Sequence, residues 1–429
     1  MKPSFYERLR RALGPLRPVI GPILRPLRRS LRRLEASGSP LASTYHVHDL
    51  TMNHALSREE HASCVALSDA IQALYDDAPA YVARQGLDPE IFLPGNEWAG
   101  IVPVSGLKFK TDYNHINYLR LHAPFAGYHL AVLDRLDSGG KFPKAEAEAF
   151  VTKLWADGIP DDIAERQKAR FDPATRLRHV LPEYLDHIRN VPARYIAQTP
   201  RTFGEIGLDI NGVLVHTDVM LCQSRINGLY SSGILEKLDQ DIARRGRARI
   251  LEVGAGYGAL AYALKRIYGE RLEYIVVDLP SSLWYAALYL STLAGGDGCT
   301  LLKPGEPTPE RFQYLFVANY LLEQALPSLG PIDLAINTMS FSEMSVKQVR
   351  YYGEAIRRLI GRDGVLFDEN FAPGAHHVDN KAIFAGIFPY RRRFTSSAVT
   401  TKNWCQDVWA NRYLGVVFDR SDGGAPSSR

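Results

Sequence analysis

The stretch ILEVGAGYGALAYAL, residues Ile250–Leu264, decides the fold class of this chain. It holds most of a short apolar strand, which we expect over Arg249–Val253, and continues into the glycine-rich turn Gly254–Gly258. A helix is expected to follow over Ala259–Tyr268. Glycines are needed here because the chain must turn sharply and a ligand must approach the backbone without a Cβ in the way. The N–H groups at the start of the helix can then bind that ligand.

The next strand, expected over Glu273–Asp278, ends in an acid twenty residues after Gly258. A carboxylate at that position can accept hydrogen bonds from the hydroxyls of a ribose, so the turn and the acid together predict an adenosine-containing cofactor. Because the turn also satisfies G-x-G-x-x-A, with Ala259 as its last residue, a nicotinamide cofactor and an NAD(P)-dependent oxidoreductase remain an alternative. Glu252 favours S-adenosylmethionine, because it completes an E-x-G-x-G-x-G pattern that resembles methyltransferase motif I.

Strands and helices alternate from Ala248 onward. The further elements that we expect are the helices Ser281–Ala294 and Ser345–Ile360 and the strands Tyr314–Val317, Ile332–Asn337, Gly364–Asp368 and Tyr413–Phe418, the last as a late edge strand. Alternating units with short connections imply a parallel sheet with right-handed crossovers. The predicted fold is therefore α/β, with a Rossmann-like, doubly wound methyltransferase sheet behind a mostly helical N-terminal domain.

Changes in composition divide the chain into four predicted parts. Residues 1–44 form a basic arm rich in Arg, Pro and Leu, and residues 45–246 form a mostly helical domain on the acceptor side. Residues 247–420 form the S-adenosylmethionine-binding methyltransferase domain, and residues 421–429 form a disordered tail.

The clearest helix of the N-terminal domain is expected over Ser57–Asp77. Ser57 and Glu60 form a capping box at its start. Pro79 follows, and because proline cannot donate a backbone hydrogen bond, the helix should end before it.

The net charge of +4 is unevenly distributed. Residues 1–35 carry ten Lys or Arg and two Glu, so this segment has a charge of +8 and the remaining chain a charge of −4. The body is therefore not a basic nucleic-acid-binding domain. The arginines of the arm lie largely off an Ile/Leu stripe, a pattern typical of a helix on an anionic membrane surface. A solubilising arm is an equal alternative.

The chain has no apolar run of the ~18 residues that a membrane-spanning helix needs. Its cysteines stand far apart, with no pair at zinc-ligand or redox spacing: Cys64, Cys222, Cys299 and Cys405. This usage fits a reducing compartment. We therefore expect a cytoplasmic protein, with the arm at the inner face of the membrane if it binds lipid. The sequence makes no prediction about oligomeric state.

Several segments together resemble the family of sugar O-methyltransferases, class I enzymes that depend on S-adenosylmethionine. They are Ile250–Leu264, VDLPSSLWYA at Val277–Ala286, INTMSFSEMS at Ile336–Ser345, LFDEN at Leu366–Asn370, FGEIG at Phe203–Gly207 and INGVLVHTD at Ile210–Asp218. The resemblance covers about half the chain, and SFSEM and FDEN are its most specific parts. It implies methyl transfer to a hydroxyl of a sugar in a polysaccharide or glycolipid. The choice of an oxygen acceptor rests on the resemblance alone.

The predicted cofactor-binding residues belong to the turn and the neighbouring strand ends: Glu252, Gly254, Ala255, Gly256, Tyr257, Gly258, Asp278, Leu279 and Asn337. In a doubly wound sheet, ligands lie beyond the carboxyl ends of the strands. A sugar hydroxyl is a poor nucleophile, so a general base should assist it. Glu343 is the first candidate, although it could instead favour the start of the next helix. His216 is the second, among histidines that include His115, His376 and His377.

Asp368 ends the expected strand Gly364–Asp368, and with Glu369 and Asn370 after it forms an oxygen-rich cluster that could hold Mg²⁺. The preceding strand ends in Asn337 rather than in an acid, so we favour a metal-free site over a magnesium site. Alternatively, the three residues turn the chain and make local hydrogen bonds.

The polar and aromatic run Asp112–Arg120 could line a sugar site, because sugars are bound by stacking and dense hydrogen bonding. An ordinary interdomain surface is the alternative. Arg391, Arg392 and Arg393 could meet a phosphate or an anionic glycan, although a solvated charged face is the simpler interpretation. A third function that the sequence allows is a non-catalytic module that docks on a membrane through the arm.

Overall fold

The computed structural model describes residues 47–51, 55–95, 109–122, 173–205, 207–371, 378–394 and 404–419. The predictions made for the basic arm, for the tail at 421–429 and for His376 and His377 lie outside the described residues. None of the helices in the described part of the chain combines the length and hydrophobicity that crossing a membrane would require.

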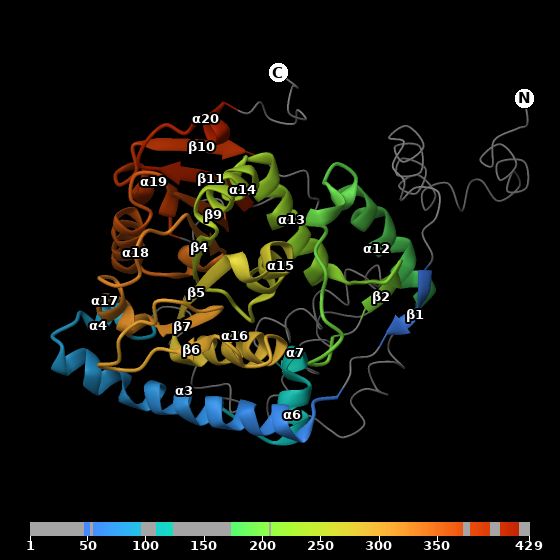
Figure 1. Ribbon diagram of the computed structural model, residues 1–429, viewed down its shortest axis with the longest axis horizontal. Coiled ribbons are helices and arrows are strands. Elements are labelled where there is room, and N and C mark those ends of the chain that lie inside the picture. Colours follow the sequence, from blue (N-terminus) through green and yellow to red (C-terminus); the bar gives the residue numbers. More distant parts are fainter. Residues whose placement is uncertain are drawn as a thin grey trace, which may run out of the picture.

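An eight-stranded sheet forms the centre of the molecule (Figure 1). In chain order its strands are β4 (Ala248–Val253), β5 (Leu272–Asp278), β6 (Cys299–Leu301), β7 (Tyr314–Ala318), β8 (Leu334–Thr338), β9 (Val365–Phe371), β10 (Tyr390–Phe394) and β11 (Trp404–Ala410). Across the sheet the order is β10-β11-β9-β8-β4-β5-β7-β6. Neighbouring strands are parallel except at β11, which is antiparallel to both β9 and β10. The predicted α/β fold class is confirmed.

Helices cover both faces of this sheet (Figure 1). The strand order runs outward from β4 in two directions. Right-handed crossovers therefore place α15 (Ala259–Tyr268) and α16 (Pro280–Leu293) on one face and α18 (Val346–Leu359) on the other. Helices α13 (Thr217–Ser231) and α14 (Ile234–Arg245) contact each other, and α13 contacts α15. The inner strands are apolar along their length because both of their faces are buried, as in β7.

The longest helix of the described N-terminal region, α3 (Arg58–Arg84), packs along α16 (Figure 1). It starts at the predicted capping box. The prediction that it ends before Pro79 is wrong, because the helix continues for five residues beyond it. Pro79 is exposed, while Tyr81 is buried and packs against the ring of Tyr320 with centroids 5.1 Å apart. This packing outweighs the backbone hydrogen bond that the proline removes.

The remaining elements are short, apart from α12 (Pro173–Ile188), which packs against α13. A second sheet, not predicted from the sequence, has the order β1-β2-β3, from Val47–Thr51, Gly207–Ile210 and Val213–Val215. Strands of this length carry too little alternation to stand out in a sequence. The short helices are α4 (Pro89–Phe92), α6 (Tyr113–Asn117), α7 (Leu119–His122), α17 (Leu322–Ala325), α19 (Asn380–Ala385) and α20 (Gly415–Phe418), with the 3-10 helices η4 (Ala193–Tyr195), η5 (Gly269–Arg271), η6 (Asn319–Leu321) and η7 (Ser340–Glu343).

The C-terminal edge of the sheet differs from the prediction in two ways. The late strand expected at Tyr413–Phe418 is wrong, because this segment contains helix α20 and the last strands are β10 and β11. The strand expected to end at Asp368 runs on to Phe371. Its last residues stay in the sheet because they pair with β11, where Asp407 lies opposite Asp368. The residues after Asp368 therefore do not turn the chain.

Candidate functional site

The glycine-rich turn lies at the carboxyl end of β4, beside the end of β5. Val253 pairs with Val277 in these two parallel strands, and the Gly254 N–H donates to the Val277 carbonyl over 2.9 Å. Gly254, Gly256 and Gly258 have φ of +76°, +59° and +93°, in the left-handed region that favours glycine. The turn therefore needs all three glycines for its backbone, and the last of them is the N-cap of α15.

Two of these glycines also allow close packing. A Cβ on Gly254 would overlap the hydroxyl of Ser340, which follows β8. A Cβ on Gly258 would lie 2.8 Å from a methyl carbon of Leu290 in α16. The protein thus holds the turn from two sides, and a side chain at either position would displace it.

Asp278 ends β5, next to the glycine-rich turn at the end of β4. Its carboxylate accepts the Leu279 N–H at 2.8 Å, and the backbone N–H of Ala255 in the turn also acts to lower its pKa. Burial raises the pKa of Asp278 to about 7, and the carboxylates of Glu252 and Glu343 add to the shift, against the two backbone donors. The two features that predict a cofactor, the turn and the acid, therefore lie at the ends of neighbouring strands.

Glu252 and Asn337, both predicted to bind the cofactor, make their contacts inside the protein. The Glu252 carboxylate accepts the hydroxyl of Tyr274 at 2.7 Å, and burial raises the pKa of Glu252 to about 7. The Asn337 side chain donates to the Val253 carbonyl at 2.8 Å and accepts the Phe341 N–H at 3.1 Å. In these positions both side chains can support the turn from the interior of the sheet.

Glu343, the first candidate for general base, is the last residue of η7. It is half-buried, and its charge acts on Asp278. Helix α18 does not need it as a cap, because Ser345 caps this helix in a complete capping box with Gln348. Met339, just ahead of η7, has φ of +71°, a strained value for a non-glycine residue that is typical of functional sites.

A buried cluster of charges that the sequence did not predict surrounds Tyr257. Arg120 forms ion pairs with Glu205, at 2.5 Å, and with Asp218, and its guanidinium carbon lies 3.2 Å from the centre of the Tyr257 ring. The Tyr257 hydroxyl donates to Asp218 at 3.3 Å. His216 Nε2 lies 3.0 Å from a Glu205 oxygen. His216 thus belongs to the cluster that holds Tyr257, whereas Glu343 lies near Asp278.

Burial disfavours charged side chains in this cluster, but the attraction between Arg120 and its acidic partners outweighs this cost. The pKa of Glu205 is lowered by Arg120 and His216 against the effect of burial, and the pKa of Arg120 is raised by its acidic partners. The partners lie up to 98 residues apart in the chain, so no local spacing links them. These partners lie in segments that stand out in the sequence, Asp112–Arg120, Phe203–Gly207 and Ile210–Asp218, but nothing in the sequence pairs the three. In the first segment, His115, Asn117 and Arg120 are buried rather than presented on a surface.

Asp368 and Glu369, the candidate metal ligands, point to opposite faces of β9 because consecutive residues of a strand alternate. The Asp368 carboxylate pairs with Lys381 at 2.6 Å, and the Glu369 carboxylate pairs with Arg225 at 2.9 Å. Across the ranges that the structure describes, no group of three or more His, Cys, Asp or Glu side chains could hold a metal ion. Two carboxylates that face apart and neutralise cations do not form the ligand pair of a Mg²⁺ site.

The three arginines considered for an anionic ligand lie in β10. Arg391 and Arg393 pair with the buried Asp407 at 2.8 and 3.5 Å, and Arg392 donates to the Val417 carbonyl. Arg391 also lies over the ring of Trp409, at 4.8 Å from its centre. These contacts anchor the edge strand to the sheet and neutralise a buried acid.

A comparison with protein-family models gives no match, and a comparison with curated proteins gives none either. Among solved structures, the chain is similar to an arsenic(III) S-adenosylmethionine methyltransferase from Chlamydomonas reinhardtii, at 17% identity and a TM-score of 0.27, over 38% of this chain and 62% of that one. It therefore spans less than two thirds of that protein. The O-methyltransferase TomG from Streptomyces achromogenes matches at 14% identity and a TM-score of 0.31, over 43% and 80% of the two chains. Magnesium protoporphyrin IX methyltransferase from Synechocystis PCC 6803 matches at 14% identity and a TM-score of 0.31, over 45% of this chain and 82% of that one. Similarities of this degree do not assign an activity to the chain.

Proposed function

We propose that this protein is an S-adenosylmethionine-dependent O-methyltransferase that acts on a sugar of a polysaccharide or glycolipid. One observation supports the cofactor most: Asp278, at the end of β5, lies next to a turn built from three left-handed glycines, whose Gly254 N–H donates to the Val277 carbonyl. Backbone N–H groups and a carboxylate at two adjacent strand ends suit an adenosyl ligand, whose ribose hydroxyls are donors. The sugar acceptor rests on the resemblance of the sequence segments.

The topology disfavours the nicotinamide alternative. The usual dinucleotide-binding sheet has the order 3-2-1-4-5-6, with its sixth strand added in parallel beside the fifth. Here the antiparallel strand β11 is inserted between β9 and β10. The sheet that the structure describes therefore lacks the second βαβαβ half with which the dinucleotide-binding fold binds the other nucleotide.

In the proposed reaction, some residues of the chain bind the cofactor and another accepts a proton. When bound, S-adenosylmethionine supplies a methyl group that passes from its sulfur to the acceptor oxygen. The turn Gly254–Gly258 and Asp278 would hold the adenosyl part, and much of the acceleration would come from alignment with the acceptor. Glu343 would take up the proton of the acceptor hydroxyl, since it lies in η7, which follows β8, the strand beside β4 and its glycine-rich turn.

Calorimetric titration of the full chain with S-adenosylhomocysteine and, separately, with NADPH tests the cofactor. We expect S-adenosylhomocysteine to bind and NADPH not to bind. If only NADPH binds, the protein is an oxidoreductase instead. If neither binds, the non-catalytic module becomes the better description.

Affinity for S-adenosylhomocysteine should fall as the pH drops below about 7. The ionised Asp278 carboxylate accepts the ribose hydroxyls, and because its pKa is about 7 in the free protein, a proton must be removed before binding at lower pH. The dissociation constant should rise by up to about tenfold per pH unit below neutrality and level off above it. Asp278→Asn should bind more weakly at alkaline pH and lose most of this dependence. Calorimetry across the neutral range checks this, and a constant affinity in the unchanged protein would contradict the role of Asp278.

The acceptor is tested by mass spectrometry of surface glycans from a strain that lacks the protein. We expect a mass loss of one CH₂ for each sugar that is no longer methylated. The unchanged chain should restore the mass. Glu343→Gln keeps the size of the side chain but cannot accept the proton, so it should lower the rate about 10²- to 10⁴-fold and restore little. Unaltered glycans in the deletion strain would remove the sugar from the proposal.

The basic arm is proposed as a membrane contact. Its ten Lys or Arg within residues 1–35 could each add about 1 kcal/mol of attraction at an anionic surface. Deleting residues 1–35 should therefore abolish sedimentation with anionic lipid vesicles and leave the binding of S-adenosylhomocysteine unchanged. Vesicles of neutral lipid serve as the control. Undiminished sedimentation of the shortened chain would show that the arm is only a solubilising segment.

A further inference from the structure

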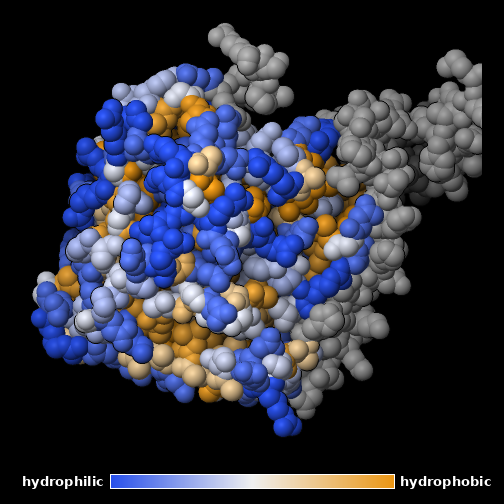
Figure 2. Space-filling view, in the orientation of Figure 1, coloured by the Kyte–Doolittle hydropathy of each residue, from blue (hydrophilic) through white to orange (hydrophobic). Residues whose placement is uncertain are grey.

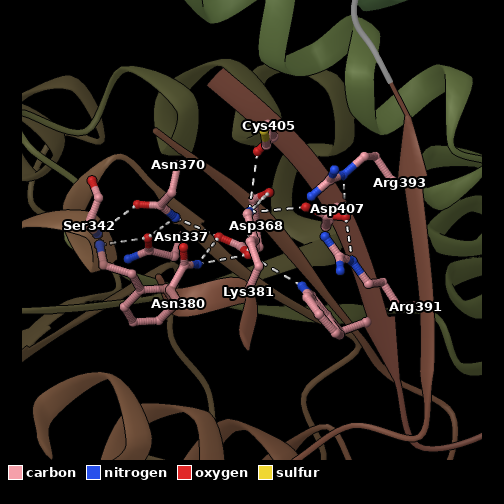
Figure 3. A network of polar contacts seen from close by, with 12 residues as sticks. Asn337, Ser342, Asp368, Asn370, Asn380, Lys381, Arg391, Arg393, Cys405 and Asp407 are labelled. Atoms are coloured by element: carbon pink, nitrogen blue, oxygen red, sulfur yellow. Dashed lines mark hydrogen bonds and ion pairs between the residues drawn. The ribbon is translucent and has the colours of Figure 1, made fainter. Parts of the chain in front are cut away.

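Asp368, in β9, is the centre of a buried polar network (Figure 3). Its carboxylate accepts the side-chain amides of Asn370, at 2.5 Å, and of Asn380, at 2.9 and 3.0 Å, and it pairs with Lys381 at 2.6 Å. Lys381 also lies 3.2 Å from Asp407. All five side chains are buried, so the network has almost no contact with solvent.

One branch of this network reaches the glycine-rich turn. Asn370 donates to Asn337 at 2.9 Å and accepts the N–H of Ser342, within η7, at 3.1 Å. Asn337 donates to the carbonyl of Val253, directly before the turn, at 2.8 Å, and to the hydroxyl of Ser340 at 2.5 Å. Ser340 in turn occupies the space that the first glycine of the turn leaves open.

The ionised carboxylate of Asp368 determines how both amides are oriented. A carboxylate only accepts hydrogen bonds, so the NH₂ group of Asn370 must face Asp368, and its oxygen is then left for the Ser342 N–H. The same NH₂ group meets the oxygen of Asn337, whose own NH₂ group must therefore face Val253. A single orientation of each side chain satisfies these contacts.

Stability alone is a weak reason for such a network. Replacing buried ion pairs with apolar side chains of similar volume is often neutral or stabilising. The gain from this network lies in the directions of its hydrogen bonds, which fix the backbone of two segments beside the candidate cofactor site. These are the end of β4 and the helix η7 that carries Glu343.

We infer that Asn370 is a positioning residue of the cofactor site. With its orientation set by Asp368, it holds the glycine-rich turn and η7 at the separation that the cofactor requires. The inference rests on the proposed function, because it presumes that S-adenosylmethionine binds between these two segments.

Asn380 provides a matched control. It is also an asparagine that donates to the Asp368 carboxylate, and within the described residues its side-chain amide donates to nothing else. Asn370→Ala and Asn380→Ala should both lower Tm, because each removes a donor from the Asp368 carboxylate. Only Asn370→Ala should weaken the binding of S-adenosylhomocysteine in calorimetry, by about tenfold or more, because it removes the side-chain acceptor of the Ser342 N–H and one of the two donors to the buried Asn337 oxygen. It should also speed hydrogen exchange of the amides at 340–343.

Equal affinities in the two variants, with unaltered exchange at 340–343, would overturn the inference. If Asn370→Ala does not fold, Asn370→Ser keeps a polar side chain at this position but loses the amide donors to Asp368 and Asn337. Its affinity should fall in the same direction, and an affinity equal to that of the unchanged chain would again overturn the inference. If the unchanged protein binds no S-adenosylhomocysteine, the proposed function fails, and the exchange rates at 340–343 still test the positioning.

Discussion

Replacing Gly254 with alanine should weaken the binding of S-adenosylhomocysteine by more than about 100-fold. The left-handed backbone, with φ of +76°, costs an L-residue about 1–2 kcal/mol. The new Cβ would also overlap the Ser340 hydroxyl, so the turn must move away from η7. A displacement of ~1 Å in groups that position a ligand can cost about two orders of magnitude. Calorimetric titration measures the loss.

Gly246→Ala is the control for the cost of placing an alanine at positive φ. Gly246 has φ of +77° at the C-cap of α14, and a Cβ there would meet nothing within 4 Å. This variant should lower Tm through the same backbone strain and leave the affinity unchanged. If Gly254→Ala binds S-adenosylhomocysteine as the unchanged chain does, the turn is not the cofactor site.

Replacing Lys381 with methionine should lower the free energy of unfolding by about 3–5 kcal/mol, as is usual when one member of a buried ion pair is removed. The ammonium lies between the carboxylates of Asp368, at 2.6 Å, and Asp407, at 3.2 Å. Methionine keeps much of the volume but leaves two buried acids facing each other across the β9–β11 pair. Denaturant unfolding, followed by fluorescence or circular dichroism, measures the change.

Arg393→Met is the matched control, because it also removes a cation from Asp407. The Arg393 side chain is 56% exposed and lies 3.5 Å from Asp407, whereas that of Lys381 is 4% exposed. An exposed pair contributes at most about 1 kcal/mol, so this variant should change the free energy of unfolding little. A similar loss in the free energy of unfolding for the two variants would show that the effect of Lys381 does not depend on its burial.

The strand–turn–helix unit was predictable because every signal for it is local. The apolar run before Gly254, the glycines that reach positive φ and the helix after them are neighbours in the chain. The position of Asp278 beside the turn follows from one general rule, that parallel strands place their carboxyl ends at the same edge. For the same reason η7, directly after β8, could be expected near this edge.

The errors concern contacts between segments far apart in the chain. Pro79 remains within a helix because Tyr320, more than two hundred residues later, packs against the next turn. The sequence predicts that the strand ends at Asp368, whereas pairing with β11 keeps Glu369 and Asn370 in the sheet as well. Neither Tyr320 nor β11 can be recognised from the sequence around Pro79 or Asp368.

The sequence by itself determined the class of fold and predicted a place for a nucleoside-like ligand, because periodicity, glycines and strand ends act over a few residues. Only the tertiary structure decided which polar side chains face that place and which are engaged in the interior. The ion pair of Asp368 with Lys381 and the pairing of Arg120 with Glu205 join distant segments. Their charges are tolerated only because folding brings each pair together in a medium that would otherwise penalise both members.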